Sequence, residues 1–197
     1  MDAYIKLLAL TALANVCPAR DSQPGNAPFM LASELEMQLN DQITLEYEAF
    51  YLYEKMAAYF SRADKSLFGF AAYFRQAAEE EKEHAREFIE FINQRFGTVI
   101  LKNINLPLDM PQSWSSPIDA LKVALQREAD VYNSILNAYK SAERLRDFHM
   151  QDFLDHFAKE QASALFKLKS LITRLDGKGP TVEYLIDREL AEKPSMH

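Results

Sequence analysis

Residues 74–88 read FRQAAEEEKEHAREF, and this stretch decides the fold. Phe74 and Phe88 belong to an apolar stripe that repeats at helical spacing. Glu81 and His84 fall on the same stripe, where a core-facing helix would otherwise carry apolar side chains. The stretch therefore predicts a long amphipathic helix whose buried face is interrupted near its middle by polar residues.

Three more segments carry an apolar stripe that a polar residue interrupts near its midpoint. Each stripe advances in steps of three and four residues, which keeps its members on one face of a helix. In chain order, the residues that interrupt the four stripes are Glu46, Glu81, His84, Glu128 and Gln161. The pattern predicts four helices of similar length with their polar residues at one level.

Local start and stop signals set the expected ends of these helices. Ser33 and Glu36 have capping-box spacing, and Ser116 precedes a Pro that suits the first helical position. Gly97 and Gly177 are typical stops. The expected helices cover about residues 34–62, 65–97, 116–144 and 147–175, followed by a short fifth helix over 181–192.

The connections between these helices are uneven. The first and third are short, so each joins two antiparallel helices in a hairpin. Residues 97–115 contain Pro107 and Pro111 and show no helical period. These 19 residues could span about 60 Å when extended, which is enough to return along the bundle. The sequence therefore predicts an all-α four-helix bundle with a long crossover between its second and third helices, plus the short fifth helix.

The polar layer would place three carboxylates together inside a dry core. Charged carboxylates there would repel one another and lose much of their hydration free energy, unless a cation lies between them or they are protonated. No Lys or Arg lies in the four stripes, so a bound metal ion is the economical explanation. Oxygen ligands with a single imidazole favour iron, because the stripes hold no thiolate and a calcium loop would not use His.

Each part of the pattern also has a purely structural interpretation. Residues 79–83 read EEEKE, which is typical of a solvated charged face. A single Glu46 in an apolar stripe could instead accept a hydrogen bond from a stray buried donor. The coincidence of level and facing across four helices is what favours a shared metal site.

Composition and charge limit the classes of function. The chain has 197 residues, of which 48% are hydrophobic and only 5 are Gly, and this favours one helical domain over a Gly-rich β-sandwich. A formal net charge of −7 argues against a sequence-independent grip on nucleic acid and suits a protein that binds cations. No apolar run reaches the roughly 20 residues that a membrane anchor needs.

The first residues predict a secreted protein. A short apolar run follows Lys6, and small residues lie before an expected cleavage at Arg20, as in a secretory signal peptide. The alternative is an amphipathic first turn of a cytoplasmic protein, because Asp2 cancels the charge of Lys6. Cys17 is the only cysteine and would leave with the signal, so the mature chain would have no disulfide. The expected layout is a signal peptide over 1–19, a flexible segment over 20–33 and a folded domain over 34–192.

Together these residues resemble the ferritin family over about residues 39–190. The segments that carry the resemblance are TLEY at 44–47, EEKEHA at 80–85, Glu128, DFL at 152–154, Glu160 with Gln161, and YLID at 184–187. The resemblance implies a ferritin-like di-iron bundle that stores iron. It also implies ferroxidase activity, in which Fe(II) is oxidised to Fe(III) with dioxygen and ferric mineral is deposited in a shell.

The resemblance implies a role for each residue of the polar layer. Glu46 and His84 would belong to one iron site, and Glu81 would bridge the two irons. Glu128 would hold the second iron. Gln161 would orient a water or an oxygen species beside that second iron.

The resemblance assigns four residues outside the polar layer as well. Tyr53 would supply an electron or a hydrogen bond near the irons, although a core tyrosine with a satisfied hydroxyl is the structural alternative. Glu80 would pass iron on, and a solvated acid is its alternative. Asp152 and Asp155 would line a threefold pore through which iron enters.

The branch of the family and the assembly follow from the same resemblance. The sequence after Gln161 lacks the second Glu-x-x-His of bacterioferritins and symmetric di-iron oxygenases, which implies no haem, and Ala164 cannot supply the extra glutamate of a third iron site, which implies two irons per subunit. The family forms homo-oligomeric shells of 24 subunits whose small-molecule partners are ferrous iron and dioxygen. The alternatives are a secreted iron storage or transport shell without catalysis, a di-iron oxygenase and a helical signalling bundle.

Overall fold

The computed structural model describes residues 29–104 and 113–193, and within these ranges the chain is helical with no strand. The helices are α1 (Ser33–Phe60), α2 (Phe68–Gln94), α3 (Pro117–Leu145), α4 (Phe148–Leu175) and α5 (Pro180–Glu192). The predicted all-α class and the number of helices are therefore confirmed. The predicted signal peptide, and all but the last residues of the predicted flexible segment, lie outside the described residues.

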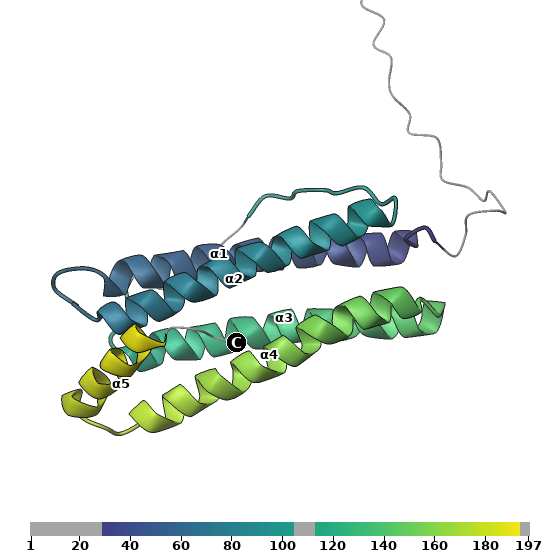
Figure 1. The fold of residues 1–197 in the computed structure, drawn as a ribbon. Coiled ribbons are helices and arrows are strands. Elements are labelled where there is room, and N and C mark those ends of the chain that lie inside the picture. The colour runs from purple at the N-terminus through teal and green to yellow at the C-terminus, as the bar shows by residue number, and fades with distance from the viewer. Residues whose placement is uncertain (1–28, 105–112, 194–197) are drawn as a thin grey trace, which may run out of the picture.

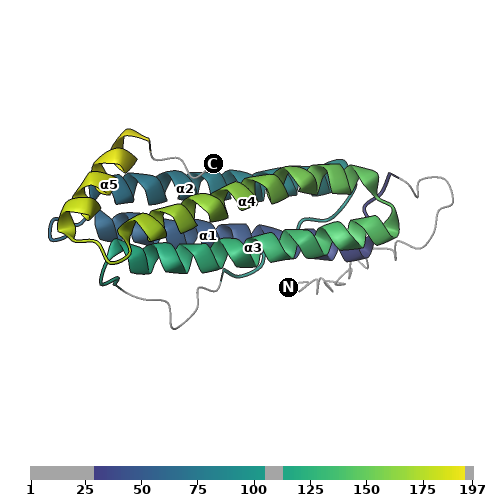
Figure 2. The same ribbon diagram turned by 90° about the horizontal axis from the view of Figure 1, so that it is seen from below.

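The four long helices form two layers of two, as Figure 1 shows. Helices α1 and α2 make one antiparallel hairpin, and α3 and α4 make the other. Helix α3 runs parallel to α2, which is the direction that a crossover requires (Figure 2). The short α5 lies across one end of the bundle, where it contacts α2 and α4. None of the helices in the described part of the chain is long and apolar enough to cross a membrane.

Two predicted features of the helix ends are wrong. The expected capping box at Ser33 and Glu36 does not form, because the Glu36 N–H donates to the Ala32 carbonyl at 2.9 Å and Ser33 is already the first helical residue. Helix α2 begins at Phe68 rather than near Lys65. The chain needs residues 61–67 to reverse direction, and Ser66 takes a left-handed conformation there, with φ of 52°.

Helix α2 also ends earlier than the stop predicted at Gly97. Its last residue is Gln94, and the left-handed residue after it is Phe96, with φ of 56°. Gly97 is required for a different reason, because a Cβ atom there would lie 2.6 Å from the Ile92 side chain. The glycine therefore permits close approach of the chain to α2. The ends of α3 and α4 agree with the prediction, and the Asp147 side chain caps α4 by accepting from the Met150 N–H at 3.0 Å.

The crossover is held against α1 at both of its described ends. Near its start, Asn40 donates to the Thr98 carbonyl at 3.0 Å and accepts from the Ile100 N–H at 2.6 Å. Near its end, the Trp114 carbonyl accepts from the Tyr59 hydroxyl at 2.7 Å. Because Asn40 and Tyr59 lie in opposite halves of α1, the crossover spans most of the bundle, as predicted (Figure 1).

Arg95 joins three parts of the fold at the end of the bundle that lies away from α5. Its guanidinium is only 1% exposed and donates to both carboxylate oxygens of Asp147, at 3.1 and 2.7 Å, and to the Phe29 carbonyl at 2.9 Å. Burial would raise the pKa of Asp147, but the hydrogen bonds from Arg95 and Met150 hold it below its usual value. This contact ties the end of α2 to the start of α4 and to the segment before α1.

A polar layer divides the apolar core into two clusters. One cluster lies toward α5 and includes Phe60, Phe74 and Leu168. The other lies toward the opposite end and includes Leu39, Phe88 and Phe157. All four long helices contribute to both clusters, and the predicted polar residues (Glu46, Glu81, His84, Glu128 and Gln161) fall between the two contributions of their helices. The prediction that these residues share one level is therefore confirmed.

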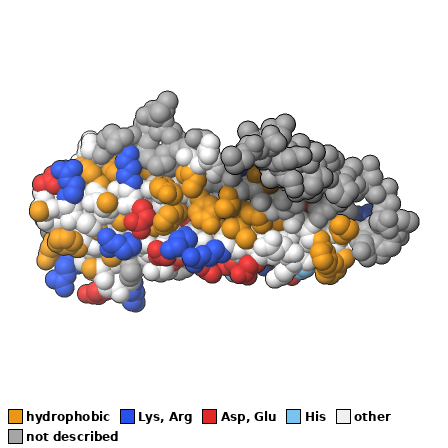
Figure 3. Space-filling model, turned by 90° about the horizontal axis from the view of Figure 1, so that it is seen from above, with side chains coloured by type: hydrophobic (Ala, Val, Ile, Leu, Met, Phe, Trp, Pro, Cys, Tyr) orange, Lys and Arg blue, Asp and Glu red, His pale blue; other side chains and the backbone are white. Residues whose placement is uncertain are grey.

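Apolar side chains also gather on the outer face of α1, α2 and the crossover. Figure 3 shows this patch beside basic and acidic side chains. Tyr51 and Leu101 are exposed there, and a hollow of about 400 Å³ lies between them. The patch is the largest apolar feature visible in this view.

Candidate metal centre

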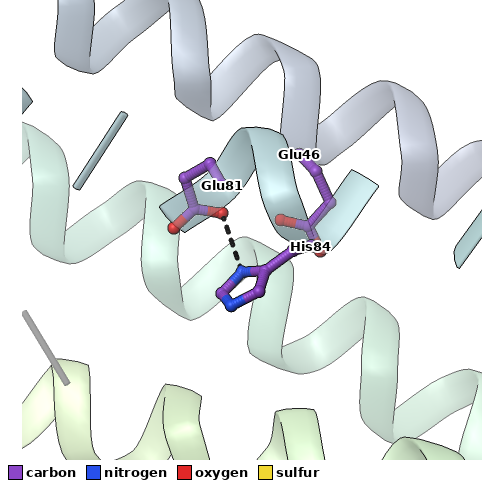
Figure 4. Close-up of side chains that lie close together, drawn as sticks. All are labelled: Glu46, Glu81 and His84. Carbon is purple, nitrogen blue, oxygen red and sulfur yellow. Dashed lines mark ion pairs between the residues drawn. The ribbon is translucent and has the colours of Figure 1, made fainter. Parts of the chain in front are cut away.

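Three side chains from α1 and α2 converge inside the bundle. Glu46 comes from α1, whereas Glu81 and His84 come from adjacent turns of α2 (Figure 4). One potential ligand atom from each lies within 4.8 Å of the other two. The His84 Nδ1 is 3.6 Å from Glu81 Oε2, and all three side chains are buried. Two carboxylates and one imidazole at this spacing can act as ligands of a single metal ion.

The electrostatics of this group are unbalanced without a cation. Burial raises the pKa of Glu81 well above its usual value, and the nearby Glu128 raises it further. Burial and the charge of Glu81 do the same to Glu46, whose protonated form can donate to Glu81. Apart from such a shared proton, no donor in the described residues reaches either Glu81 oxygen. A divalent ion would bind these oxygens and remove the repulsion.

Glu128 faces the group from α3 and has its own partners. The Tyr53 hydroxyl donates to Glu128 Oε1, and both side chains are fully buried. Burial raises the pKa of Glu128, while Tyr53 and the neighbouring Gln161 amide of α4 lower it by a smaller amount. Glu128 does not join the compact group of Glu46, Glu81 and His84, but its charge acts on Glu81. We call Glu46, Glu81 and Glu128 the central acids.

A carboxylate on α4 lies close to the outer nitrogen of His84. Glu160 Oε2 lies 3.4 Å from His84 Nε2, and its other oxygen lies 3.4 Å from His156 Nε2. With Glu160 on the side of Nε2, the His84 ring presents Nδ1 to the central acids, 3.6 Å from Glu81 Oε2. The sequence reasoning did not select Glu160 or His156 as site residues. Their spacing of four on one helix face, directly before Gln161, was the available signal.

Gln42 is a third residue that the sequence reasoning missed. It lies one turn before Glu46 on α1, is 2% exposed, and donates from Nε2 to Glu46 Oε1 at 2.6 Å. Its position on the helix face of Glu46 was the only sequence signal. An amide there reads as an ordinary polar residue at the edge of the apolar stripe.

The remaining predicted site residues lie outside the buried group. Glu80 is half-buried and accepts a hydrogen bond from Gln76 at 3.0 Å. Its charge also raises the pKa of Glu81, by less than burial and Glu128 do. Asp152 is exposed on α4, and Asp155 pairs with Lys159 at 2.5 Å. The predicted roles of Glu80 in iron transfer and of the two aspartates in a pore stay predictions.

Comparison with known proteins agrees with this fold. Residues 36–177 match the ferritin-like domain that describes the ferritin family. The chain is 38% identical to soma ferritin of Lymnaea stagnalis over 165 residues, which cover 83% of this chain and 94% of that protein. It is 38% identical to the ferritin middle subunit of Salmo salar over 160 residues, which cover 79% and 90% of the two chains. It is 35% identical to the oocyte isoform of the ferritin light chain of Xenopus laevis over 163 residues, which cover 79% and 89%. The chain belongs to the ferritin family.

Proposed function

We propose that this ferritin oxidises Fe(II) to Fe(III) with dioxygen at its buried centre, as the catalytic step of iron storage. The observation that carries the proposal is the buried group of Glu46, Glu81 and His84, with Glu128 facing it. A subunit that only lined a shell would have no reason to retain three buried acids at one level, because their charges destabilise the folded chain.

The residues divide into two iron-binding halves. Glu46 and His84 would bind the first Fe(II), and Glu81 would reach both ions because neither of its oxygens is occupied by a donor other than a shared proton. Glu128 would bind the second ion, with Gln161 beside it. The two ferrous ions are the substrate. Each gives up one electron, and dioxygen accepts both.

Tyr53 and Glu80 would act beside the two ions. The Tyr53 hydroxyl donates to Glu128 Oε1, so it would fix the direction of the second Glu128 oxygen beside the second ion. Glu80 is half-buried at the edge of the group, where a carboxylate could accept Fe(III) leaving the centre. We also propose that each subunit binds two irons and no haem.

We further propose that the chain assembles into a hollow shell of 24 subunits. The apolar patch on α1, α2 and the crossover is surface that subunit contacts would bury. Asp152 and Asp155 would then meet their counterparts from neighbouring subunits and form an acidic pore. Export from the cell through residues 1–19 is also part of the proposal. Light scattering of the purified mature protein tests the assembly, and a monomeric or dimeric mass would contradict it.

The alternative function is a secreted iron storage or transport subunit without catalysis. The two functions differ in whether the centre binds and oxidises iron. The test adds Fe(II) to the metal-free protein, admits air, and follows the ferric absorbance in the ultraviolet. We expect a fast rise with the natural chain and at least a hundredfold slower rise with Glu81→Gln.

A matched control separates loss of the centre from loss of surface charge. Glu79 lies on the same helix, is exposed and pairs with Lys82 at 2.7 Å, so Glu79→Gln removes the same charge outside the centre. We expect this variant to oxidise iron at the natural rate. If the natural chain gives no fast rise, or if Glu81→Gln matches Glu79→Gln, the ferroxidase function is wrong and the alternative stands.

A further inference from the structure

Gln42 has no part in the roles given above, yet it is built into the centre. Its side chain is 2% exposed, and its Nε2 donates to Glu46 Oε1 at 2.6 Å. Glu46 Oε2 receives no donor from the described residues, apart from a proton shared with Glu81. The amide thus occupies one oxygen of the carboxylate and leaves the other for a metal ion.

The direction of this amide is fixed by its partner. If its nitrogen and oxygen were exchanged, the amide oxygen would face Glu46 Oε1, whereas the proton of a protonated Glu46 is shared with Glu81, so the assigned orientation is the one that forms a bond. A side-chain donor to a ligating carboxylate restricts its rotation and is a common way to orient a ligand before the metal arrives. Gln42 therefore fixes Glu46 in the orientation that faces Glu81 and His84.

The carbonyl of the same amide is an unused acceptor. Gln42 Oε1 is buried, and no donor in the described part of the chain reaches it. Because the two amide atoms share one carbon, Oε1 lies within about 5 Å of Glu46 Oε1, given the 2.6 Å bond. A buried acceptor without a donor is destabilising, and because this one lies next to Glu46, a donor that arrives with the metal would satisfy it.

A water molecule on the metal ion is a donor of the right kind. An octahedral ion bound by Glu46, Glu81 and His84 keeps about three further positions for water or bridging oxygen. A tetrahedral Zn²⁺ with the same ligands keeps only about one. Octahedral ions therefore have more bound water to place beside the amide carbonyl than Zn²⁺ has.

We propose that Gln42 is a positioning residue of the metal centre, whose NH₂ group holds Glu46 and whose carbonyl accepts from a water on the first metal ion. The proposal deepens the proposed function and rests on it. It makes Gln42 a determinant of metal selectivity, favouring octahedral ions such as Fe²⁺ and Co²⁺ over Zn²⁺.

The same helix supplies a matched control. Gln38 lies one turn before Gln42, donates from Nε2 to Ser141 Oγ at 3.0 Å, and has a buried Oε1 without a donor among the described residues. It is two turns from Glu46 and does not contact it. Gln38 is half-buried and Gln42 is buried, but Gln38→Leu and Gln42→Leu remove the same chemical groups from the same helix, and only the second change touches the centre.

The experiment measures binding of Co²⁺ and Zn²⁺ to the assembled, metal-free protein by calorimetry, with the visible absorption of Co²⁺ as a second readout. We expect Gln42→Leu to weaken Co²⁺ binding by about 10- to 100-fold and Zn²⁺ binding by less, with an altered Co²⁺ spectrum. Gln38→Leu should leave both affinities and the spectrum unchanged. Gln42→Met, an unbranched side chain without the amide, should behave like Gln42→Leu and guards against poor packing of the branched one.

Three results would overturn the proposal. They are natural Co²⁺ affinity in Gln42→Leu and Gln42→Met, equal losses in the Gln38 and Gln42 variants, and equal losses for Co²⁺ and Zn²⁺. In each case the natural chain would still bind Co²⁺ and oxidise Fe²⁺, so the proposed function would stand. If the natural chain itself neither binds Co²⁺ nor oxidises iron, the proposed function is what fails.

Discussion

Replacing Glu81 by Gln should make the metal-free protein more stable while abolishing its response to metal. Glu81 is fully buried, its pKa is raised by burial and by Glu128, and it receives no donor except through a proton shared with Glu46. The Gln side chain has nearly the same shape without the charge. Its NH₂ group can also donate to the remaining central acids. The substitution therefore relieves repulsion in the folded state and leaves the packing in place.

The size of the effect follows from general values for buried charges. Replacing buried ionic groups by neutral ones of similar volume has stabilised proteins by about 1–4 kcal/mol. We expect about 2 kcal/mol for Glu81→Gln, in the middle of this range, because the protonated fraction of the acid in the natural chain already avoids part of the repulsion. In a domain of this size, about 2 kcal/mol corresponds to a rise in melting temperature of roughly 4–8 °C.

The assay is thermal unfolding near neutral pH, with a chelator and then with Co²⁺. Glu79→Gln is the control, since Glu79 lies on the same helix, is exposed and pairs with Lys82 outside the centre. Without metal, Glu81→Gln should melt above both the natural chain and the control. With Co²⁺, the natural chain and the control should gain stability and Glu81→Gln should not. A melting temperature below that of the natural chain, or an equal response to Co²⁺, would refute the reasoning.

Three more outcomes follow from the described contacts. Burial raises the folded-state pKa of the central acids above the ordinary value of 4.5, so the folded chain binds protons that the unfolded chain releases. The metal-free protein should therefore lose stability as pH rises from about 4.5 toward those pKa values, as chelator-treated samples melted across this range can show. Tyr53→Phe removes the donor to Glu128, a bond worth about 1.5 kcal/mol or more, and should slow iron oxidation about tenfold in stopped-flow absorbance, with little change in fold. Asp147→Ala leaves the buried Arg95 without its carboxylate and should lower the free energy of unfolding by about 3 kcal/mol in denaturant titration, whereas an exposed acid such as Glu79 replaced by Ala should change it little.

The helices and the polar layer could be predicted because both depend on the spacing of apolar and polar residues along nearby stretches of the sequence. Apolar residues at steps of three and four identify a helix face wherever they occur. Glu128 is recognisable because it is a charged residue at a position of such a stripe. The crossover was predictable from the absence of such spacing over a stretch too long for a turn. The shared level of Glu46 and Glu81 follows from the similar lengths of the helices, so the sequence alone predicts that the two acids meet.

The features that sequence could not supply depend on contacts between distant segments. Nothing near Arg95 indicates that its partner is Asp147, because the two meet only after the crossover has closed the bundle. Phe96 adopts a left-handed conformation that its residue type disfavours, so the sequence predicts the helix stop at the neighbouring Gly97 instead. Gln42 escaped because an amide at the edge of an apolar stripe has many uses, and only its 2.6 Å contact identifies this one.

The division of the centre between two hairpins has a consequence for how the protein is made. Glu46, Glu81 and His84 all lie in the first hairpin, whereas Glu128 and Gln161 belong to the second. As the chain leaves the ribosome, α1 and α2 are complete before any of α3 has been synthesised. A nascent hairpin would then already carry a three-ligand cation site, open to the cell on the side that α3 and α4 later cover. An ion captured at that stage would neutralise the charges against which the second hairpin must pack, so the supply of metal would affect the yield of folded subunits as well as their loading.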